Sequence, residues 1–260
     1  MSRLRRPLLA AVALLCAGLA VVHFAHPRVA RAQAPAAGAG APAPADGLAA
    51  QGRGLFVDGC ASCHGLDAAG IPGRGPSLRG VGAQAADFYL STGRMPLNNP
   101  HDAPVRVKPA YTKPQRAAIT AYVASLGGPP IPAVDPAHGS LSVGQKAFTT
   151  HCAGCHQVLA RGGIATPAAV APSLQQASAT QVAEALRIGP YLMPKFSDRQ
   201  IDQHSVDSIA RYVLWTRHPD NAGGWGIGNI GPIPEGMVAW FLALAALVIV
   251  ARLIGERTPT

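Results

Sequence analysis

The pattern of apolar and polar positions divides the chain into two apolar runs and a longer middle part with helical periodicity. The runs are Leu8 to Val22 and Gly236 to Ile254, and Arg252 is the one charged residue inside them. Between the runs, apolar residues recur at helical spacing over residues 47–57, 83–91 and 112–126. The 24 prolines and 29 glycines indicate plentiful loops between these segments. We therefore expect a mainly α-helical protein with short helices.

The second apolar run, residues 236–254, predicts a transmembrane helix. Its length approaches the roughly 20 residues that a spanning helix needs, and Trp240 and Arg252 are of the types that favour the membrane interface. A buried helix of a soluble protein is the alternative. Because basic residues prefer the cytoplasmic side, Arg252 and Arg257 predict a cytoplasmic C-terminus in the cell membrane.

The first apolar run follows Arg3, Arg5 and Arg6, which is the arrangement of a signal for export. Residues Ala30 to Ala32 offer a cleavage site. The apolar stretch extends to Ala25 with only His23 interrupting it, so a retained membrane anchor is an equal alternative. Residues 1–32 are therefore expected to be a signal peptide or an N-terminal anchor, and either would place the following domains outside the cytoplasm.

The middle of the chain consists of two similar halves. An Ala/Pro-rich linker over residues 33–46 precedes a first unit at 47–131, and a second unit at 138–222 precedes a Gly-rich connector at 223–235. Several landmarks recur in the same order in both units, with spacings that drift as loop lengths change. The matched residues are Gly52 and Gly144, Phe56 and Phe148, Leu78 and Leu174, Met95 and Met193, and Tyr122 and Tyr212. We call the units the first and the second repeat.

Each repeat contains the pattern Cys-x-x-Cys-His, which is the attachment signature of c-type haem. The pattern occupies Cys60 to His64 and Cys152 to His156. Two thiols three positions apart lie on one side of a helical turn, where both can bond the vinyl groups of one porphyrin. The following histidine can then bind the iron. The sequence therefore predicts two covalently bound haem c groups, attached through Cys60 and Cys63 and through Cys152 and Cys155, with His64 and His156 as axial ligands.

Two other roles of paired cysteines were weighed. A shared zinc site would use all four thiolates, but the two pairs are much farther apart than in zinc ribbons, and zinc does not explain the adjacent histidines. A thioredoxin-like redox motif needs a βαβ context, which the pattern of the chain does not predict. Haem attachment is the better interpretation of both motifs.

The second axial ligand of each iron is predicted to be a methionine. The chain has four methionines, and Met95 and Met193 are each followed by proline at a matching place in the two repeats. Filling of the apolar core is the alternative role. Five histidines beyond the N-terminal segment and outside the motifs lie in polar or loop contexts and are expected at the surface, namely His101, His138, His151, His204 and His218.

Two loops carry further expectations. The carbonyl groups of Pro76 and Pro172 are predicted to accept a hydrogen bond from the Nδ1 atoms of His64 and His156, which would fix the imidazole rings. An insertion at Leu97 to Pro109 follows Met95 and has no counterpart after Met193. We expect this insertion to be a surface excursion that contacts a partner.

The charge distribution argues against a nucleic-acid partner. The net charge is +9, but five arginines before residue 46 account for more than half of it. The two repeats are nearly neutral, so the sequence lacks the basic patch that nucleic-acid binding requires.

With these features, the chain resembles the dihaem cytochrome c subunit, cytochrome cc, of the actinobacterial cytochrome bc1 complex. The resemblance extends from about Gly47 to Arg257. Its most specific stretches are Gly75 to Leu78, Ser91 to Pro96, Gly189 to Pro194 and Gly228 to Gly236. It implies two tandem cytochrome c-type domains and membership of a quinol–cytochrome c reductase, with this chain as an electron-transfer subunit that converts no substrate alone.

The resemblance also implies partners and a route for electrons. The route runs from menaquinol through a Rieske iron–sulfur protein to the first haem, then to the second, and on to an aa3-type oxidase. Cytochrome b, the Rieske protein and the oxidase are the implied partners. A cytochrome c subunit of a cbb3-type oxidase or of a membrane dehydrogenase remains the alternative, although the former is anchored by an N-terminal helix and the latter usually carries three haem motifs.

Overall fold

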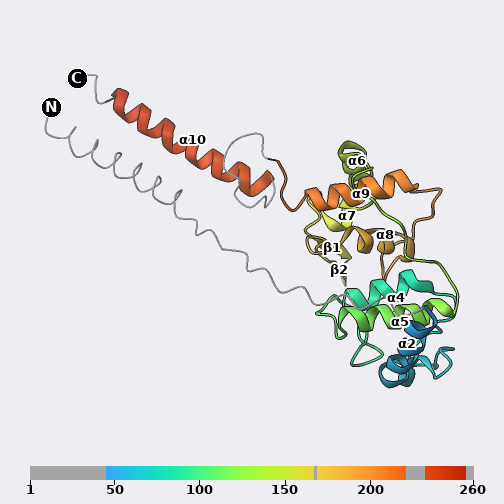
Figure 1. The fold of residues 1–260 in the computed structure, drawn as a ribbon. Coiled ribbons are helices and arrows are strands. Elements are labelled where there is room, and N and C mark those ends of the chain that lie inside the picture. Colours follow the sequence, from blue (N-terminus) through green and yellow to red (C-terminus); the bar gives the residue numbers. More distant parts are fainter. Residues whose placement is uncertain (1–44, 167–168, 221–231, 256–260) are drawn as a thin grey trace, which may run out of the picture. The chain divides into compact units, whose positions relative to one another are not determined.

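The computed structural model describes residues 45–166, 169–220 and 232–255 (Figure 1). The predicted signal or anchor and nearly all of the linker before residue 47 lie outside these residues. The described helices confirm the mainly α-helical class, and they form two similar sets followed by one long apolar helix. The helix α10, Pro232–Gly255, starts within the predicted connector and contains a stretch, Gly236–Gly255, that is long and apolar enough to cross a membrane.

The first repeat contains four helices. They are α2 (Ala45–Gly59), α3 (Ala61–His64), α4 (Gly82–Ser91) and α5 (Lys113–Ser125). The start of α5 is fixed by a capping box, in which the Thr112 backbone N–H donates to Gln115 Oε1 at 2.9 Å. The segment between α3 and α4 is a loop, as the glycines and prolines there predict.

The second repeat has the corresponding helices and one addition. The helices are α6 (Leu141–His151), α7 (Ala153–His156), α8 (Ala179–Ile188) and α9 (Gln203–Trp215). Between α7 and α8, the strands β1 (Gly163–Thr166) and β2 (Ala169–Ala171) pair antiparallel. The hairpin was not predicted, because strands of four and three residues are too short to show an alternating pattern.

A close helix crossing organises each repeat. In the first, α2 crosses α5, and in the second, α6 crosses α9. At the crossings, a Cβ atom on Gly52 would collide with the Ala118 carbonyl, and a Cβ atom on Gly144 would collide with the Ser208 carbonyl. The recurrence of these two glycines thus has a physical reason, since only a residue without a side chain allows the backbones to come so close.

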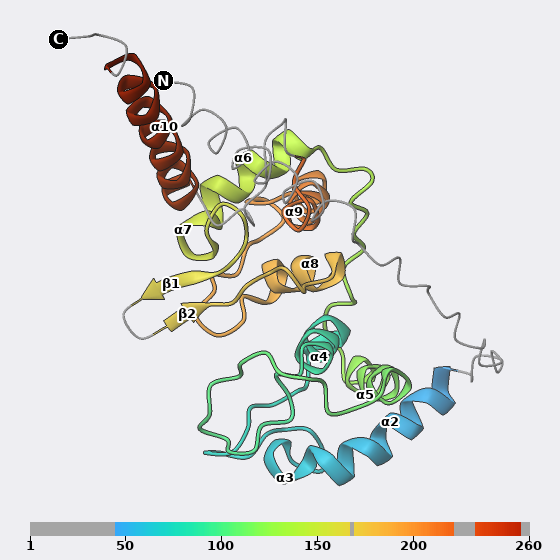
Figure 2. The ribbon, with the colours of Figure 1, turned by 90° about the vertical axis from the view of Figure 1, so that its left-hand side faces the viewer.

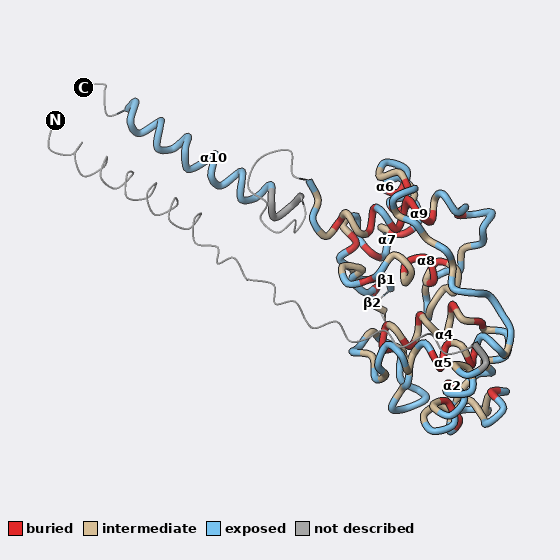
Figure 3. Tube along the Cα trace, viewed as in Figure 1, coloured by how far each residue is buried: buried red, intermediate tan, exposed pale blue. Residues whose placement is uncertain are grey.

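An aromatic pair fills the core beside each crossing. The ring centroids of Phe56 and Tyr122 are 5.1 Å apart, and those of Phe148 and Tyr212 are 5.3 Å apart, with interplanar angles of 51° and 50°. Each repeat therefore has its own apolar core around the same motif (Figure 3). The helices α4 and α8 also pack against each other, which joins the two repeats (Figure 2).

Candidate haem sites

The two Cys-x-x-Cys-His motifs have the same backbone geometry. A long helix ends at the first cysteine, whose N–H donates to a phenylalanine carbonyl at 2.8 Å in both repeats, Phe56 in one and Phe148 in the other. A single further turn then carries the second cysteine and the histidine, and the histidine N–H donates back to the first cysteine at 2.9 Å. Both thiols and the imidazole are thus held on one short helical turn.

Each motif histidine is oriented by a proline carbonyl. His64 Nδ1 lies 2.8 Å from the Pro76 carbonyl, and His156 Nδ1 lies 3.0 Å from the Pro172 carbonyl. These are the predicted hydrogen bonds, and they are confirmed. When Nδ1 donates, Nε2 is the nitrogen left to bind a metal, so both rings are set for axial ligation.

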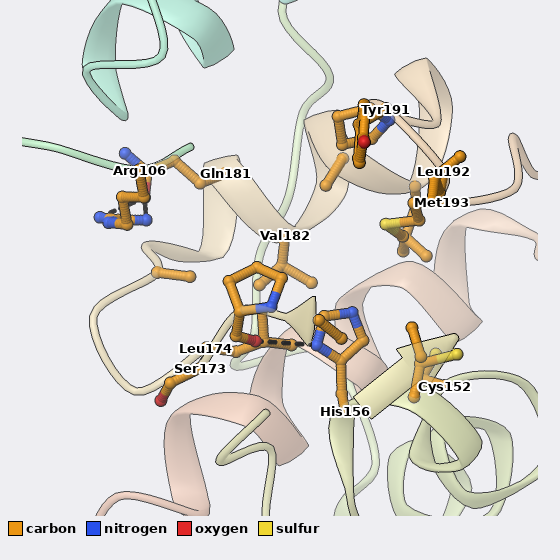
Figure 4. Close-up of a pocket in the computed structure, with 18 of the residues that line it drawn as sticks. Arg106, Cys152, His156, Ser173, Leu174, Gln181, Val182, Tyr191, Leu192 and Met193 are labelled. Carbon is orange, nitrogen blue, oxygen red and sulfur yellow. Dashed lines mark hydrogen bonds between the residues drawn. The ribbon is translucent and has the colours of Figure 1, made fainter. Parts of the chain in front are cut away.

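The second repeat encloses a cavity of about 430 Å³ that contains the predicted site residues. Cys152, Cys155, His156 and Met193 all line it, and Figure 4 shows Met193 and the His156 ring at its wall. Apolar side chains supply much of the remaining lining, among them Leu174, Val182, Leu186, Ile209 and Val213. This volume lies in the usual range of ligand pockets.

In the first repeat, two of the predicted site residues contact the same apolar core. Cys60 and Met95 both pack against the apolar core around Phe56 and Tyr122. Cys60, Cys63, His64 and Met95 are all half-buried. The structure therefore brings the predicted ligands of the second repeat together around one cavity, and it places Cys60 and Met95 of the first repeat at one core.

Burial favours the uncharged forms of Cys152 and His156. It lowers the pKa of His156, against a smaller opposite effect of the hydrogen bond to Pro172, and raises the pKa of the Cys152 thiol to about 12. A neutral imidazole is the form that binds iron. The apolar lining, the free thiols and this imidazole together fit a covalently bound haem.

The alternatives to haem find no support in the described residues. All four motif cysteines are free thiols. In the described ranges, no three His, Cys, Asp or Glu side chains are grouped to hold a metal ion. The five histidines outside the motifs that the structure describes are exposed, as predicted, and one of them, His151, also borders the cavity.

Sequence reasoning missed the part of the second site that comes from the first repeat. Ala103 to Arg106 of the insertion, together with Phe88 and Arg94, line the cavity of the second motif. The Arg106 guanidinium donates to Gln181 Oε1 and to the Gln176 carbonyl, at 3.2 Å and 3.0 Å. The expected surface excursion therefore packs against the second repeat. Its lack of a counterpart in that repeat was the only sequence signal of a special role.

Family models and curated relatives agree with this geometry. Residues 49–127 match the model described as cytochrome c, and residues 139–213 match cytochrome c oxidase, cbb3-type, subunit III. The first repeat and the second repeat are thus both cytochrome c-type domains, and this type of domain implies covalently bound haem c.

Three relatives cover much of the chain. A cytochrome bc1 complex cytochrome c subunit of Corynebacterium diphtheriae is 35% identical over 231 residues, covering 81% of this chain and 82% of the relative. The subunit of that name from Mycobacterium tuberculosis is 36% identical over 271 residues, covering 98% and 93%. A cbb3-type cytochrome c oxidase subunit CcoP of Azospirillum is 29% identical over 185 residues, covering 63% of this chain and 60% of the relative. On the strength of the first two matches, the chain belongs to the family of cytochrome bc1 complex cytochrome c subunits.

Proposed function

We propose that this chain is the membrane-anchored dihaem subunit of a respiratory cytochrome bc1 complex. The cavity that collects Cys152, Cys155, His156 and Met193 is the observation that carries the proposal. One haem is bonded to Cys60 and Cys63 with His64 and Met95 as axial ligands, and the other to Cys152 and Cys155 with His156 and Met193. The bc1 assignment is supported by the coverage and identity of the relatives that bear this name.

The haem groups supply one-electron chemistry, and the side chains of this protein hold and tune them. The carbonyls of Pro76 and Pro172 orient the axial histidines. Thioether sulfur from methionine and an apolar lining both favour the reduced state, which raises the reduction potential. No acid, base or nucleophile is required, and the chain alone converts no substrate.

The proposed electron path begins at menaquinol and reaches the first repeat through the Rieske protein. It continues to the second repeat and then to an aa3-type oxidase. The exposed rim of the second cavity supports the last step, because Val170, Tyr191 and Leu192 line the cavity and are 76%, 63% and 59% exposed. Small apolar patches of this kind suit brief contacts between redox proteins.

Helix α10 anchors the subunit in the cell membrane, in our proposal, with both repeats outside the cytoplasm and the C-terminus inside. Its residues from Gly236 to Gly255 are exposed, as expected for a helix in contact with lipid. Cytochrome b and the Rieske protein are its partners in the complex.

A cytochrome subunit of a cbb3-type oxidase is the second candidate. The family model matched by residues 139–213 and the relative from Azospirillum favour it. That relative aligns with a smaller share of this chain than the bc1 subunits do, and its sequence identity to this chain is lower.

Purification in mild detergent tests the proposal. We expect a c-type α-band in the reduced-minus-oxidised spectrum, two haems per chain by pyridine haemochrome assay, and co-purification of cytochrome b and a Rieske protein. A chain without the c-type band would contradict the haem assignment. Co-purification of a haem–copper oxidase core without cytochrome b and Rieske protein would favour the cbb3 candidate instead.

The axial methionines can be tested one at a time. Met95→Ala and Met193→Ala should each convert one of the two haems to a form with a lower reduction potential and a high-spin spectrum, because the iron loses its thioether ligand. Met237→Ala, in helix α10, is the matched control and should leave both haems unchanged. Redox titration and the visible spectrum of the oxidised protein provide the readout, and an unchanged pair of potentials in Met193→Ala would rule that ligand out.

A further inference from the structure

The cavity of the second motif is closed on one side by residues of the first repeat. Ala103 to Arg106, Phe88 and Arg94 all belong to the first repeat and all line this cavity. Two of them carry a guanidinium group. The cavity is lined mainly by apolar side chains, and the first repeat thus adds two positive charges to the cavity that contains the motif of the second repeat.

Arg106 is held in place by the second repeat and retains donors for a ligand. Its Nη1 and Nη2 atoms both donate to Gln181 Oε1 at 3.2 Å, and Nη2 also donates to the Gln176 carbonyl at 3.0 Å. Gln181 is itself fixed, because its Nε2 donates to Ser91 Oγ at 3.0 Å. A guanidinium has five N–H groups, so Arg106 is positioned by these bonds and still has N–H groups to offer.

Arg94 lies nearby with an unsatisfied donor. Its guanidinium carbon is 5.0 Å from the centroid of the Phe88 ring. Its Nη1 atom is buried without a hydrogen-bond partner among the described residues. Burying such a donor costs free energy unless an acceptor is supplied, so this end of the cavity lacks an acceptor.

No carboxylate of the described chain neutralises either arginine. The ion pairs found within the described ranges involve other residues. Burial lowers the pKa of Arg94, and the neighbouring charge of Arg106 lowers it further. Two cations close together in a partly buried place favour an anion between them or beside them.

The position of Arg106 relative to the cysteines indicates which anion this is. Figure 4 shows Arg106 and Gln181 at one end of the cavity and Cys152 at the other, with His156 between them. The cysteines bond the vinyl side of a haem, and the two propionate carboxylates of the haem project from the opposite edge. We propose that Arg106, assisted by Arg94, binds the propionates of the haem in the second repeat, so that the first repeat supplies the anion-binding end of the second haem site.

This inference rests on the proposed function, because it requires a haem in the second repeat. Arginine suits the task, since its planar fork can donate two parallel hydrogen bonds to one carboxylate. A positive charge beside the propionates also stabilises the reduced haem relative to the oxidised one, and therefore raises its reduction potential. The insertion at Leu97 to Pro109 is thus a positioning element for the second haem.

Redox titration of the full-length chain in detergent tests the inference through Arg106→Gln. We expect the potential of one haem to fall and that of the other to stay, and we expect the propionate-bending band in the resonance Raman spectrum to shift. Met193→His, which changes the ligand of the second haem, identifies which of the two potentials belongs to it. Lys108→Gln removes the same charge from an exposed place on the same insertion and should change neither readout.

Arg106→Lys separates charge from hydrogen bonding. Because this variant keeps the charge, its haem should have a reduction potential closer to that of the wild type than to that of Arg106→Gln. The Raman band should stay shifted, because lysine cannot donate two parallel hydrogen bonds to one carboxylate. A haemochrome assay must show two haems in every variant, which excludes loss of folding as the cause. Unchanged potentials and an unchanged Raman band in Arg106→Gln would overturn the inference, as would an equal fall of both potentials. A wild-type chain with fewer than two haems would contradict the proposed function itself, before any variant is compared.

Discussion

Glu184 of helix α8 is a buried acid at the contact between the two repeats. It has no exposed surface, and Asp87 of α4 is its charged neighbour. Burial raises its pKa to about 9, and the negative charge of Asp87 on α4 adds to the shift. The native protein therefore holds Glu184 in its protonated, neutral form at neutral pH.

Replacing this acid by its neutral analogue should stabilise the protein above pH 5. Between the unfolded pKa near 4.5 and the native pKa near 9, the native state binds a proton that the unfolded state releases, so the wild type loses stability as the pH rises. Glu184→Gln removes this loss. We expect a gain on the order of 2 kcal/mol at pH 8 and little gain at pH 5, measured by urea denaturation.

Asp102→Asn serves as the control for this prediction, because Asp102 is an exposed carboxylate on the insertion. It should leave the pH dependence as in the wild type. If Glu184→Gln showed the same decline of stability between pH 5 and pH 8 as the wild type, Glu184 would not be the group that holds the proton.

At the residue level, the sequence predicted those parts of the site that are local in the chain. The motif cysteines and histidines lie within five residues of one another, and the hydrogen bonds from His64 and His156 span 12 and 16 residues. The bonds from Arg106 to Gln176 and Gln181 span 70 and 75 residues. Such contacts depend on how two separately folded cores pack, and no periodicity or spacing in the sequence records that packing.

At the level of elements, the crossing of a long N-terminal helix with the last helix defines each repeat. Gly52 and Gly144 were recognised in the sequence as matched positions. The reason for a glycine there became clear only from the close contact of the two helix backbones at each crossing. The three longer helices of the first repeat were predicted from apolar periodicity because they are long enough to display it. The β1–β2 hairpin was missed because its strands are short and its two large apolar side chains, Ile164 and Val170, are 78% and 76% exposed.

Two glycines on helix α2 provide a direct test of the crossing. Gly52→Ala would place a Cβ atom against the Ala118 carbonyl, whereas Gly54→Ala places one in open space. We expect the first change to destabilise the protein by about 2 kcal/mol, as overpacking does. The second should stabilise it by up to about 1 kcal/mol, because alanine favours a helix over glycine. Thermal denaturation followed by far-UV circular dichroism compares them, and equal effects would show that the crossing tolerates a side chain.

At the level of the whole molecule, the two repeats differ in structure despite their common plan. The second repeat has the enclosed cavity and an exposed apolar rim, and the first repeat has the insertion that reaches that cavity. This asymmetry fits the proposed order, in which the second repeat delivers electrons to the oxidase.

A charge placed on the apolar rim should slow that delivery. Val170→Glu puts a carboxylate where the proposed contact with the oxidase must be dehydrated, and we expect electron transfer to the oxidase to slow by about tenfold. The haem spectra and potentials should stay close to those of the wild type. Val143→Glu, on helix α6 and away from the cavity lining, is the matched control. Stopped-flow oxidation of the reduced subunit by the oxidase measures the rate, and equal rates in both variants would exclude the rim as the contact.

The contribution of the insertion to the second cavity has a consequence for how the protein matures. In our proposal the chain is exported from its N-terminus, so the first repeat, with Arg94 and Arg106, can fold outside the cytoplasm before Cys152 has crossed the membrane. The second cavity is then completed against a surface that is already present. A second repeat produced alone would lack that surface, and we expect it to complete its cavity less well than the full-length chain does.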